Sequence, residues 1–221
     1  MYLCGIDEAG RGPVIGPMVM CACVIDAKYE KELKSLGVKD SKKLTPKQRE
    51  DLYPRVKKMC KYFVEIIPAT LIDSTNKDKI NLNKLEELTT AKLIQKAKEF
   101  CKGEELKIYV DAPDINFTRY GNVLSQITNT NVIAEHKADD KYPIVSAASI
   151  IAKVDRDAEI KRIKEETGLE LGSGYPADPI TKKALEQLIK SKSKYIRYSW
   201  ETTKTIINKL ENSKGIQSKL V

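Results

Sequence analysis

Short apolar runs recur along the chain, and their length and composition are typical of buried β-strands. The first is Tyr2–Asp7, and the second, Pro17–Asp26, is richer in Val, Ile and Cys than in helix formers. The same pattern returns later in the chain at Tyr62–Pro68, Leu106–Asp111 and Asn131–Glu135. The sequence therefore predicts five strands.

Between these runs the apolar residues recur at helical spacing. Thr45 followed by Pro46 is a typical helix start, with proline in the first helical position. Ser146 is predicted to cap the N-terminus of a long helix. Gly172–Pro176 is predicted to be a loop. The pattern predicts helices over Lys28–Leu36, from Pro46 to about Lys61, over Ala69–Asn76 and Asn81–Glu99, from Ser146 onward, over Ile180–Lys190 and over Trp200–Glu211.

The order of these elements indicates an α/β fold with a mixed sheet and a helical tail. The first two strands follow each other with no helix between them, which favours an antiparallel hairpin. A sheet made only of parallel strands joined by helices is therefore not expected.

Charge adds a candidate partner to this fold. The chain has 221 residues, with 39 Lys and Arg against 31 Asp and Glu, a net charge of +8 and a pI near 9.1. Two segments carry the excess: Lys28–Lys61 has twelve basic residues against five acidic ones, and Ile180–Val221 has ten against three. Solvated helical faces would explain either run alone, but a basic balance also suits a polyanion.

Cysteine spacing and hydropathy bear on location and assembly. The five cysteines, Cys4, Cys21, Cys23, Cys60 and Cys101, form no CxxC pair. We expect them to be small buried hydrophobes in a reducing compartment. No apolar run is long enough to cross a membrane. We therefore expect a cytoplasmic protein with no membrane partner, and a monomer, since no apolar surface stripe is apparent.

Two common kinds of chemistry are disfavoured by the motifs. Gly5 and Gly10 have the spacing of a phosphate loop, but Arg11-Gly12 replaces the required Lys-Ser/Thr, and a strand follows instead of a helix. The single histidine, His136, has no nucleophile-elbow motif or zinc-ligand spacing to accompany it. Any catalysis is expected to depend on carboxylates and hard metal ions.

Carboxylates stand at the ends of three predicted strands. Asp7 and Glu8 end the first, Asp111 ends another, and Asp139 and Asp140 follow a third. Strand ends form the ligand crevice of open α/β sheets, and Mg²⁺ or Mn²⁺ would relieve the repulsion between converging acids. Because side chains alternate along a strand, Asp7 and Glu8 can share one site only if the strand ends at Glu8. The simpler alternative, a helix cap or solvated strand end, is favoured for Asp140.

Five motifs in order resemble type 2 ribonuclease H (ribonuclease HII), in its archaeal form. They are GIDEAGRGPVIGP, DSKKLT (Asp40–Thr45), YVDAPD (Tyr109–Asp114), EHKADDKYPIVSAASIIAKVDRD (Glu135–Asp157) and GSGYPAD (Gly172–Asp178). The resemblance implies a ribonuclease H-like α/β fold, a five-stranded mixed sheet flanked by helices. It also implies a catalytic domain over residues 1–178 and a C-terminal helical extension over residues 179–221.

The resemblance further implies an enzyme that cuts the RNA strand of RNA/DNA hybrids and incises duplex DNA on the 5′ side of embedded ribonucleotides. Such cleavage leaves 3′-hydroxyl and 5′-phosphate ends and uses two divalent ions, Mg²⁺ or Mn²⁺. By motif, the catalytic and metal-binding acids are Asp7, Glu8, Asp111 and Asp139. Asp139 is assigned from the sequence Lys137-Ala138-Asp139.

Substrate recognition is implied at a second set of residues. Gly10-Arg11-Gly12 resembles the family motif whose backbone approaches the ribose 2′-hydroxyl, and Tyr175 resembles the tyrosine that stacks on the following deoxynucleotide's sugar. Further candidate contacts are Arg11, Lys42, Lys43, Ser146, Lys153 and Arg156.

Some alternatives remain open from the sequence. The chain could be a hybrid-binding module without catalysis, or a nuclease of the same fold acting on DNA alone. Gln217–Val221 faintly resembles a sliding-clamp box but lacks its distal aromatics, so clamp binding through it is not expected. Trp200 is expected to anchor the tail on the body of the protein.

Overall fold

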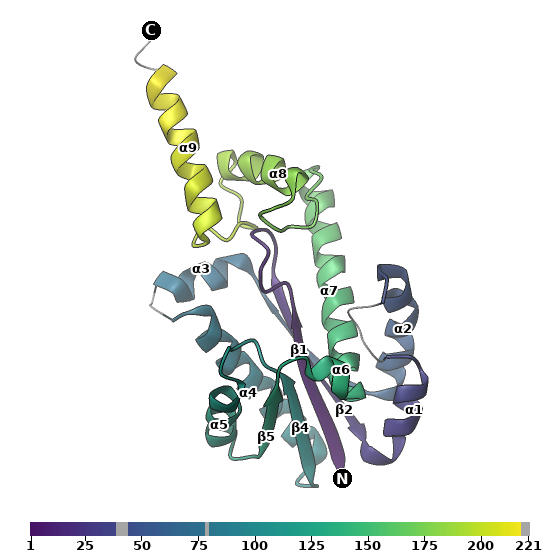
Figure 1. Ribbon diagram of the computed structural model, residues 1–221. Coiled ribbons are helices and arrows are strands. Elements are labelled where there is room, and N and C mark those ends of the chain that lie inside the picture. The colour runs from purple at the N-terminus through teal and green to yellow at the C-terminus, as the bar shows by residue number, and fades with distance from the viewer. Residues whose placement is uncertain (39–43, 78–79, 218–221) are drawn as a thin grey trace. The chain divides into compact units, whose positions relative to one another are not determined.

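The computed structural model describes residues 1–38, 44–77 and 80–217 (Figure 1). Lys42 and Lys43 lie outside these residues, as does residue 218 onward. The chain forms two compact units. The first unit comprises Met1–Ala9, Val19–Ile66 and Asn81–Asp157, and the second comprises Gly10–Met18, Ile67–Ile80 and Ala158–Val221.

The sheet has five strands in the order β3-β2-β1-β4-β5. β1 pairs antiparallel with β2 and parallel with β4, which pairs parallel with β5. The predicted mixed sheet and its N-terminal hairpin are thereby confirmed. The strands are β1 (Tyr2–Ala9), β2 (Met18–Asp26), β3 (Lys61–Ile67), β4 (Leu106–Asp111) and β5 (Val132–Glu135).

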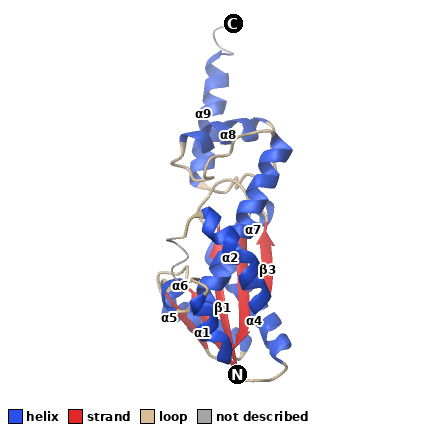
Figure 2. Ribbon diagram, turned by 90° about the vertical axis from the view of Figure 1, so that its right-hand side faces the viewer, coloured by secondary structure: helices blue, strands red, loops and turns tan. Residues whose placement is uncertain are grey.

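Helices cover both faces of the sheet (Figure 2). In the first unit the helical elements are a 3₁₀ turn (Ala27–Tyr29), α1 (Glu30–Ser35), α2 (Pro46–Met59), α4 (Leu82–Cys101), α5 (Phe117–Thr128), α6 (Ala138–Lys141) and the first part of α7 (Pro143–Thr167). The second unit contains α3 (Ala69–Lys77), the rest of α7, α8 (Pro179–Lys190) and α9 (Glu201–Gln217). Within the described part of the chain, no helix has the length and apolar character needed to span a bilayer.

Local capping explains several helix boundaries. The Thr45 hydroxyl accepts from the Gln48 amide, and the Gln48 side chain accepts from the Thr45 amide, forming a capping box before Pro46. Asn81 caps α4 by accepting from the Lys84 amide at 2.9 Å. These caps satisfy amides that have no partner within the helix, and they set the start of both helices close to where the sequence predicts it.

Three features of the helices differ from the prediction. No helix is predicted between the strand Asn131–Glu135 and the helix from Ser146, but α6 lies there. No helix is predicted between the strands Leu106–Asp111 and Asn131–Glu135, but α5 lies there, with Gly121 among its buried residues. The glycine lies against β5, where a Cβ would come within 3.3 Å of the Val132 carbonyl oxygen. α7 begins at Pro143, not at Ser146. Ser146 is fully buried inside the helix, and its hydroxyl donates to the Val38 carbonyl, so it does not serve as an N-cap.

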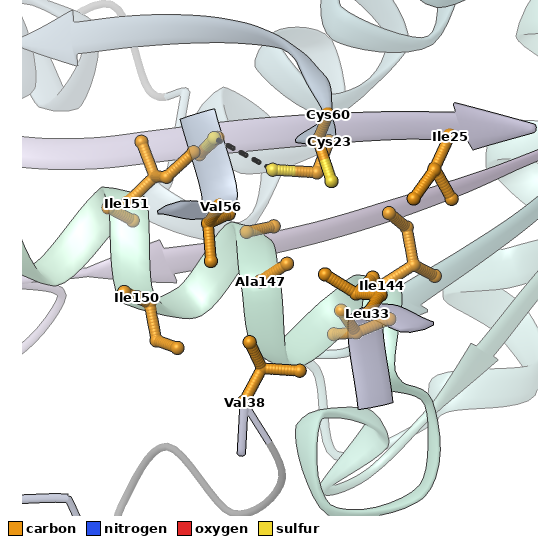
Figure 3. Packing of buried hydrophobic residues seen from close by; sticks show 14 of the residues in the cluster. Cys23, Ile25, Leu33, Val38, Val56, Cys60, Ile144, Ala147, Ile150 and Ile151 are labelled. Carbon is orange, nitrogen blue, oxygen red and sulfur yellow. Dashed lines mark hydrogen bonds between the residues drawn. The ribbon is translucent and has the colours of Figure 1, made fainter. Parts of the chain in front are cut away.

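One hydrophobic core cluster of the first unit includes residues of the sheet and of α7 (Figure 3). From β2, Cys23 and Ile25 pack toward Ile144, Ala147 and Ile151 of α7. All five cysteines are buried free thiols, as the sequence predicted. Their small side chains allow the helix to lie close to the strands.

The second unit draws together segments far apart in sequence. Its core includes Val14, Ile15, Leu171, Leu185 and Ile196, with Trp200 packed against it as expected for an anchor. The carboxylate of Asp73, on α3, accepts from the amides of residues 198 and 199 at 2.8 and 2.9 Å. The predicted boundary after residue 178, between a catalytic domain and a helical extension, stays a prediction; the compact units group residues 10–18 and 67–80 with residue 158 onward.

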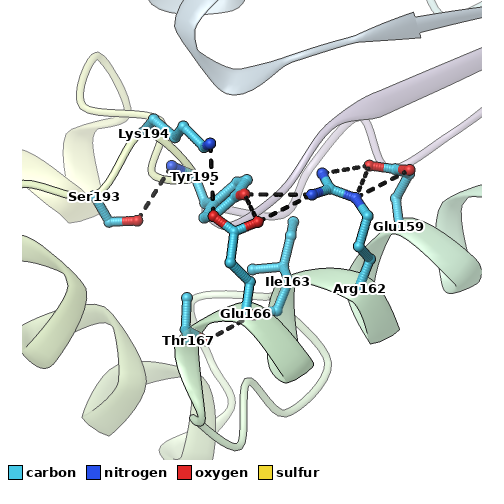
Figure 4. Close-up of polar contacts among 8 residues, drawn as sticks. All are labelled: Glu159, Arg162, Ile163, Glu166, Thr167, Ser193, Lys194 and Tyr195. Carbon is cyan, nitrogen blue, oxygen red and sulfur yellow. Dashed lines mark hydrogen bonds and ion pairs between the residues drawn. The ribbon is translucent and has the colours of Figure 1, made fainter.

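Polar contacts join the last turns of α7 to the segment before α9 (Figure 4). Arg162 pairs with Glu159 and Glu166 at 2.9 and 3.1 Å. The Tyr195 hydroxyl also donates to Glu166, and Lys194 lies 3.5 Å from the same carboxylate. Exposed ion pairs contribute little individually, so we regard this network as orienting the segment more than stabilising it.

Candidate active site

Asp7, Asp111 and Asp139 form a compact carboxylate cluster in the first unit. One oxygen from each lies within 4.8 Å of the others. Asp7 is 4% exposed and Asp139 is 1% exposed, while Asp111 is half-buried. Three acids separated by up to 132 residues in sequence therefore meet at one point, as the strand-end pattern predicts.

The sheet topology accounts for this convergence. The parallel pairing of β1 with β4 ends at Ile6 and Val110, so Asp7 and Asp111 are the next residues on neighbouring strands. β5 ends at Glu135, and the left-handed conformation of Lys137 (φ 56°) turns the chain into α6. Asp111 accepts a hydrogen bond from the Ala138 amide at 3.1 Å, which fixes α6, and with it Asp139, beside β4.

A glycine on β1 brings α7 close to the cluster. A Cβ on Gly5 would collide with the backbone of Ile144, so only glycine permits this approach. The approach allows Ser149 and Lys153 of α7 to interact with Asp7. The Lys153 ammonium donates to the Ser149 hydroxyl at 2.6 Å. Lys153, a candidate phosphate contact, is thus also part of the surroundings of Asp7.

The electrostatics of the cluster favour a bound cation. Burial, followed by the charge of Asp111, raises the pKa of Asp7 to about 7, and Asp139 adds to this effect. Lys153 and Ser149 act in the opposite direction and lower the same pKa, but they offset only part of the increase. Without metal, the cluster would hold a proton near neutral pH, because adjacent carboxylates cannot all ionise at low cost.

The donor set fits a hard divalent cation. It consists of carboxylate oxygens, the ligands preferred by Mg²⁺ and Mn²⁺, with no thiol or imidazole among the three residues. A cation at this point would remove the repulsion that raises the pKa of Asp7. The residues present are therefore suited to the metal that the sequence predicted.

Glu8 does not join this cluster. β1 pairs regularly with β2 through Glu8 and Ala9, opposite Met20 and Val19, so the strand does not end at Glu8. Alternation then directs Asp7 and Glu8 to opposite faces. Glu8 lies close enough to buried Tyr120 on α5 to affect its pKa. Burial raises the pKa of Tyr120 most, and nearby glutamates, including Glu8, raise it further. The amide of Glu8 nevertheless donates to Asp7 Oδ1 at 2.7 Å.

The remaining candidate site residues in the first unit differ in how far their side chains are exposed to solvent. Asp140 is exposed on α6 and outside the cluster, which supports assigning Asp139 as the metal-binding neighbour. Arg156 is 9% exposed and Ser146 is completely buried. Burial leaves Ser146 no surface with which to touch a nucleic acid. Lys42 cannot be placed, because it lies outside the described residues.

The second unit contains Gly10-Arg11-Gly12 and Tyr175. Gly10 has φ of 83°, a conformation that favours glycine. The Tyr175 ring lies against Gly12, where a Cβ would come within 3.1 Å of ring atom Cε1. Tyr175 is 49% exposed. The glycine motif and the tyrosine are therefore neighbours on one surface of this unit.

A buried arginine holds the glycine turn. The guanidinium of Arg197 donates to the carbonyls of Gly10 and Arg11 at 2.6 and 2.7 Å, and to that of Gly16 at 3.2 Å. Arg197 has no exposed surface. Its rigid fork of donors matches several acceptors at once, which a lysine could not do. The sequence analysis missed this residue, since it lies in no motif and about 185 residues from the turn it holds.

The loop that carries Tyr175 (Gly172–Asp178) is held in place by its own polar residues. Asp178 accepts from the Ser173 amide at 2.7 Å and caps α8 by accepting from the Ile180 amide at 2.8 Å. These hydrogen bonds lower the pKa of Asp178 to about 2. The Gly174 carbonyl also accepts from the Val14 amide at 2.8 Å. The loop thus presents Tyr175 in a defined position beside the glycine turn.

A five-stranded sheet in the order 3-2-1-4-5, with buried acids where the parallel strands end, defines a ribonuclease H-like nuclease that depends on divalent metal. Comparison with known proteins narrows this class. The family model for ribonuclease HII matches residues 4–203, and the chain belongs to the ribonuclease HII family. It is accordingly a ribonuclease H, a hydrolase that cuts RNA/DNA hybrids endonucleolytically.

Individual relatives agree over nearly the whole chain. Ribonuclease HII of Thermococcus sibiricus is 44% identical, covering 100% of this chain and 97% of the relative. The crystal structure of ribonuclease H2 from Pyrococcus horikoshii OT3 has a TM-score of 0.83 and 41% identity, covering 96% of this chain and 99% of that one. A ribonuclease HII from Archaeoglobus fulgidus, solved as a complex with PCNA, has a TM-score of 0.81 and 40% identity over 91% and 96% of the two chains.

Proposed function

We propose that this ribonuclease H also incises duplex DNA on the 5′ side of embedded ribonucleotides, using two divalent ions and leaving 3′-hydroxyl and 5′-phosphate ends. The observation that carries the proposal is the buried Asp7–Asp111–Asp139 cluster. Bound there, two ions would activate a water molecule and stabilise the leaving 3′ oxygen. We propose Mg²⁺ or Mn²⁺, because all three donors are carboxylates.

The chain's own residues hold this centre in place. Asp111 is fixed by the Ala138 amide, and Asp7 is oriented by the Glu8 amide and by Ser149. We retain Glu8 as a catalytic and metal-binding acid on the strength of its motif alone, since it is not one of the three clustered acids. Ser149 and Lys153 stabilise the charged form of Asp7 before metal binds.

Selection of ribose is proposed for the second unit. The backbone of Gly10-Arg11-Gly12 could approach a 2′-hydroxyl, and a side chain at Gly12 would crowd the Tyr175 ring, because a Cβ there would lie 3.1 Å from it. Half-exposed Tyr175 would stack on the sugar of the next deoxynucleotide. The two features together would favour a ribo-to-deoxyribo junction.

Contacts to phosphate would position the duplex without selecting sequence. Half-buried Arg11 is the candidate that the structure leaves partly accessible beside the glycine turn. We keep Lys42, Lys153 and Arg156 as proposed contacts, and we propose that the protein acts as a cytoplasmic monomer. Ser146 is not retained, because it is fully buried.

The test is a cleavage assay on a DNA duplex that contains one ribonucleotide, run with Mg²⁺ and separately with Mn²⁺. We expect one nick on the 5′ side of the ribonucleotide. An all-DNA duplex of the same sequence should remain intact, which separates this enzyme from a nuclease that acts on DNA alone. The incision proposal would be refuted if the protein cut a continuous hybrid but did not cut the ribonucleotide duplex with either ion.

A further inference from the structure

An isoleucine protrudes from the first unit beside the carboxylate cluster. Ile115, in the turn between β4 and α5, is 95% exposed, and Phe117 two residues later is 40% exposed. Exposing a whole isoleucine side chain to water is unfavourable, and a turn of this kind could place a polar residue there at no cost. The position suggests a side chain that is buried by a partner.

The turn that carries Ile115 is braced. The carboxylate of Asp114 accepts from the Asn116 amide at 2.9 Å and pairs with Arg119, which also pairs with Glu87 at 3.0 Å. Asn116 caps α5 by accepting from the Arg119 amide. A turn held by this many contacts keeps its apolar tip exposed and does not fold it back onto the protein.

His136 links this turn to the one that carries Asp139. Its Nε2 donates to the Ile115 carbonyl oxygen at 3.2 Å, and its ring lies edge-on to Phe117 with centroids 5.1 Å apart. The Ala112 amide also donates to the Glu135 carbonyl oxygen at 3.0 Å. The turns after β4 and β5 are therefore joined side by side, where both strands end and α6 begins (Figure 1).

This placement ties Ile115 to the metal-binding acids. Ile115 lies four positions after Asp111, so their Cα atoms are at most about 14 Å apart even in a fully extended chain. His136 is three residues from Asp139. A duplex whose phosphodiester reaches the acids would therefore bring its neighbouring nucleotides close to this turn.

Charge near the tip permits such an approach. Asp114, which precedes Ile115, is already paired with Arg119, and Glu135 at the end of β5 is paired with Lys141. Exposed Lys137 adds a positive charge on the second turn. An apolar tip with neutralised acids around it suits the sugar and base faces of a nucleic acid, against which proteins commonly place isoleucine and phenylalanine.

We propose that Ile115, supported by Phe117 and His136, is a substrate contact that packs against the sugar faces of nucleotides next to the cut and positions the duplex over the acids. This inference rests on the proposed function of the same site. It assigns a binding role to a residue outside the acid and glycine motifs, and no catalytic role.

The test compares Ile115→Ser with Ile127→Ser. Ile127 is a matched control, since it is 49% exposed in α5 and ten residues after Phe117. On a continuous RNA/DNA hybrid we expect Ile115→Ser to raise KM about tenfold, the effect of losing partial burial of one isoleucine, with kcat within about twofold. Ile127→Ser should match the wild type, and both variants should unfold at the wild-type temperature.

A second measurement does not depend on cleavage. A photo-crosslinking amino acid placed at position 115 or at position 127 is irradiated with the hybrid in EDTA. We expect adducts to nucleotides from position 115 and none from position 127. An unchanged KM for Ile115→Ser, or crosslinks from position 115 only to a second protein chain, would overturn the inference even if the wild type cuts normally. A wild type that crosslinks but does not cut would count against the proposed function instead.

Discussion

The carboxylate cluster should destabilise the metal-free protein, and replacing Asp7 with asparagine should reveal this. The pKa of Asp7 is raised from 3.8 to about 7, chiefly by burial and by Asp111. The folded protein therefore keeps a proton that the unfolded chain releases. As pH rises from about 4 to 7, the unfolded state ionises first and the free energy of unfolding falls.

The expected size follows from that difference. One pKa unit corresponds to about 1.4 kcal/mol, so the shift amounts to at most about 4 kcal/mol above pH 7. The three acids titrate as a group, and an amide keeps the shape but not the charge of the carboxylate. We expect Asp7→Asn to raise the free energy of unfolding by about 2–4 kcal/mol at pH 8 in EDTA, and to abolish cutting.

The assay is chemical unfolding at pH 8 and at pH 4.5, with EDTA or with Mn²⁺. At pH 4.5 the advantage of Asp7→Asn should largely disappear, since Asp7 is then protonated in the folded wild type. Added Mn²⁺ should stabilise the wild type by about 2.7 kcal/mol at one hundred times its dissociation constant, and should stabilise the variant much less.

Asp140→Asn is the matched control, because Asp140 is an exposed acid next to the cluster. Its stability should change by less than about 0.5 kcal/mol at either pH. The electrostatic reasoning would be refuted if Asp7→Asn were no more stable than the wild type at pH 8 in EDTA, or if Mn²⁺ stabilised both proteins equally.

Other consequences can be checked separately. With limiting Mg²⁺, cutting should weaken as pH falls below about 7, since metal must displace the proton held near Asp7; a flat profile from pH 6 to 8 would contradict this. Tyr175→Ala should impair cutting at a single ribonucleotide more than on a long hybrid, and equal losses would remove its proposed junction role. Arg197→Met should lower the free energy of unfolding by about 3 kcal/mol, measured in urea, because three carbonyl acceptors lose a buried charged partner. Gly5→Ala should lower the free energy of unfolding by about 2–4 kcal/mol in the same assay, because the added Cβ would force α7 away from β1. A variant as stable as the wild type would show that α7 does not lie this close to Gly5.

Much of the first unit could be predicted from the sequence, because the determining signals are local. Apolar runs located all five strands to within a few residues. Pro46 and Asn81 marked helix starts through capping chemistry that acts over four residues. α5 was not predicted, and the close approach of its Gly121 to β5 is a contact that only the tertiary structure shows.

Some features of the candidate site could likewise be predicted from the sequence, and others could not. Acids at strand ends could be identified from sequence because parallel neighbours in a sheet end at the same edge. Which acid of each pair faces the cluster could not be decided by pattern. Regular pairing of β1 through Ala9 sends Glu8 to the opposite face, and the left-handed turn at Lys137 buries Asp139 and leaves Asp140 exposed.

By itself, then, the sequence determined the fold class, because strand and helix patterns are encoded in short-range spacing. It also pointed to carboxylate chemistry through acids at strand ends, and its motifs carried the resemblance to the family. Tertiary structure alone decided that Asp7 is buried beside Lys153 and Ser149, that Arg197 holds the glycine turn, and that Ile115 is exposed. These outcomes depend on contacts between residues distant along the chain. Burial and charge arise only when such residues meet, so no local pattern could have specified them.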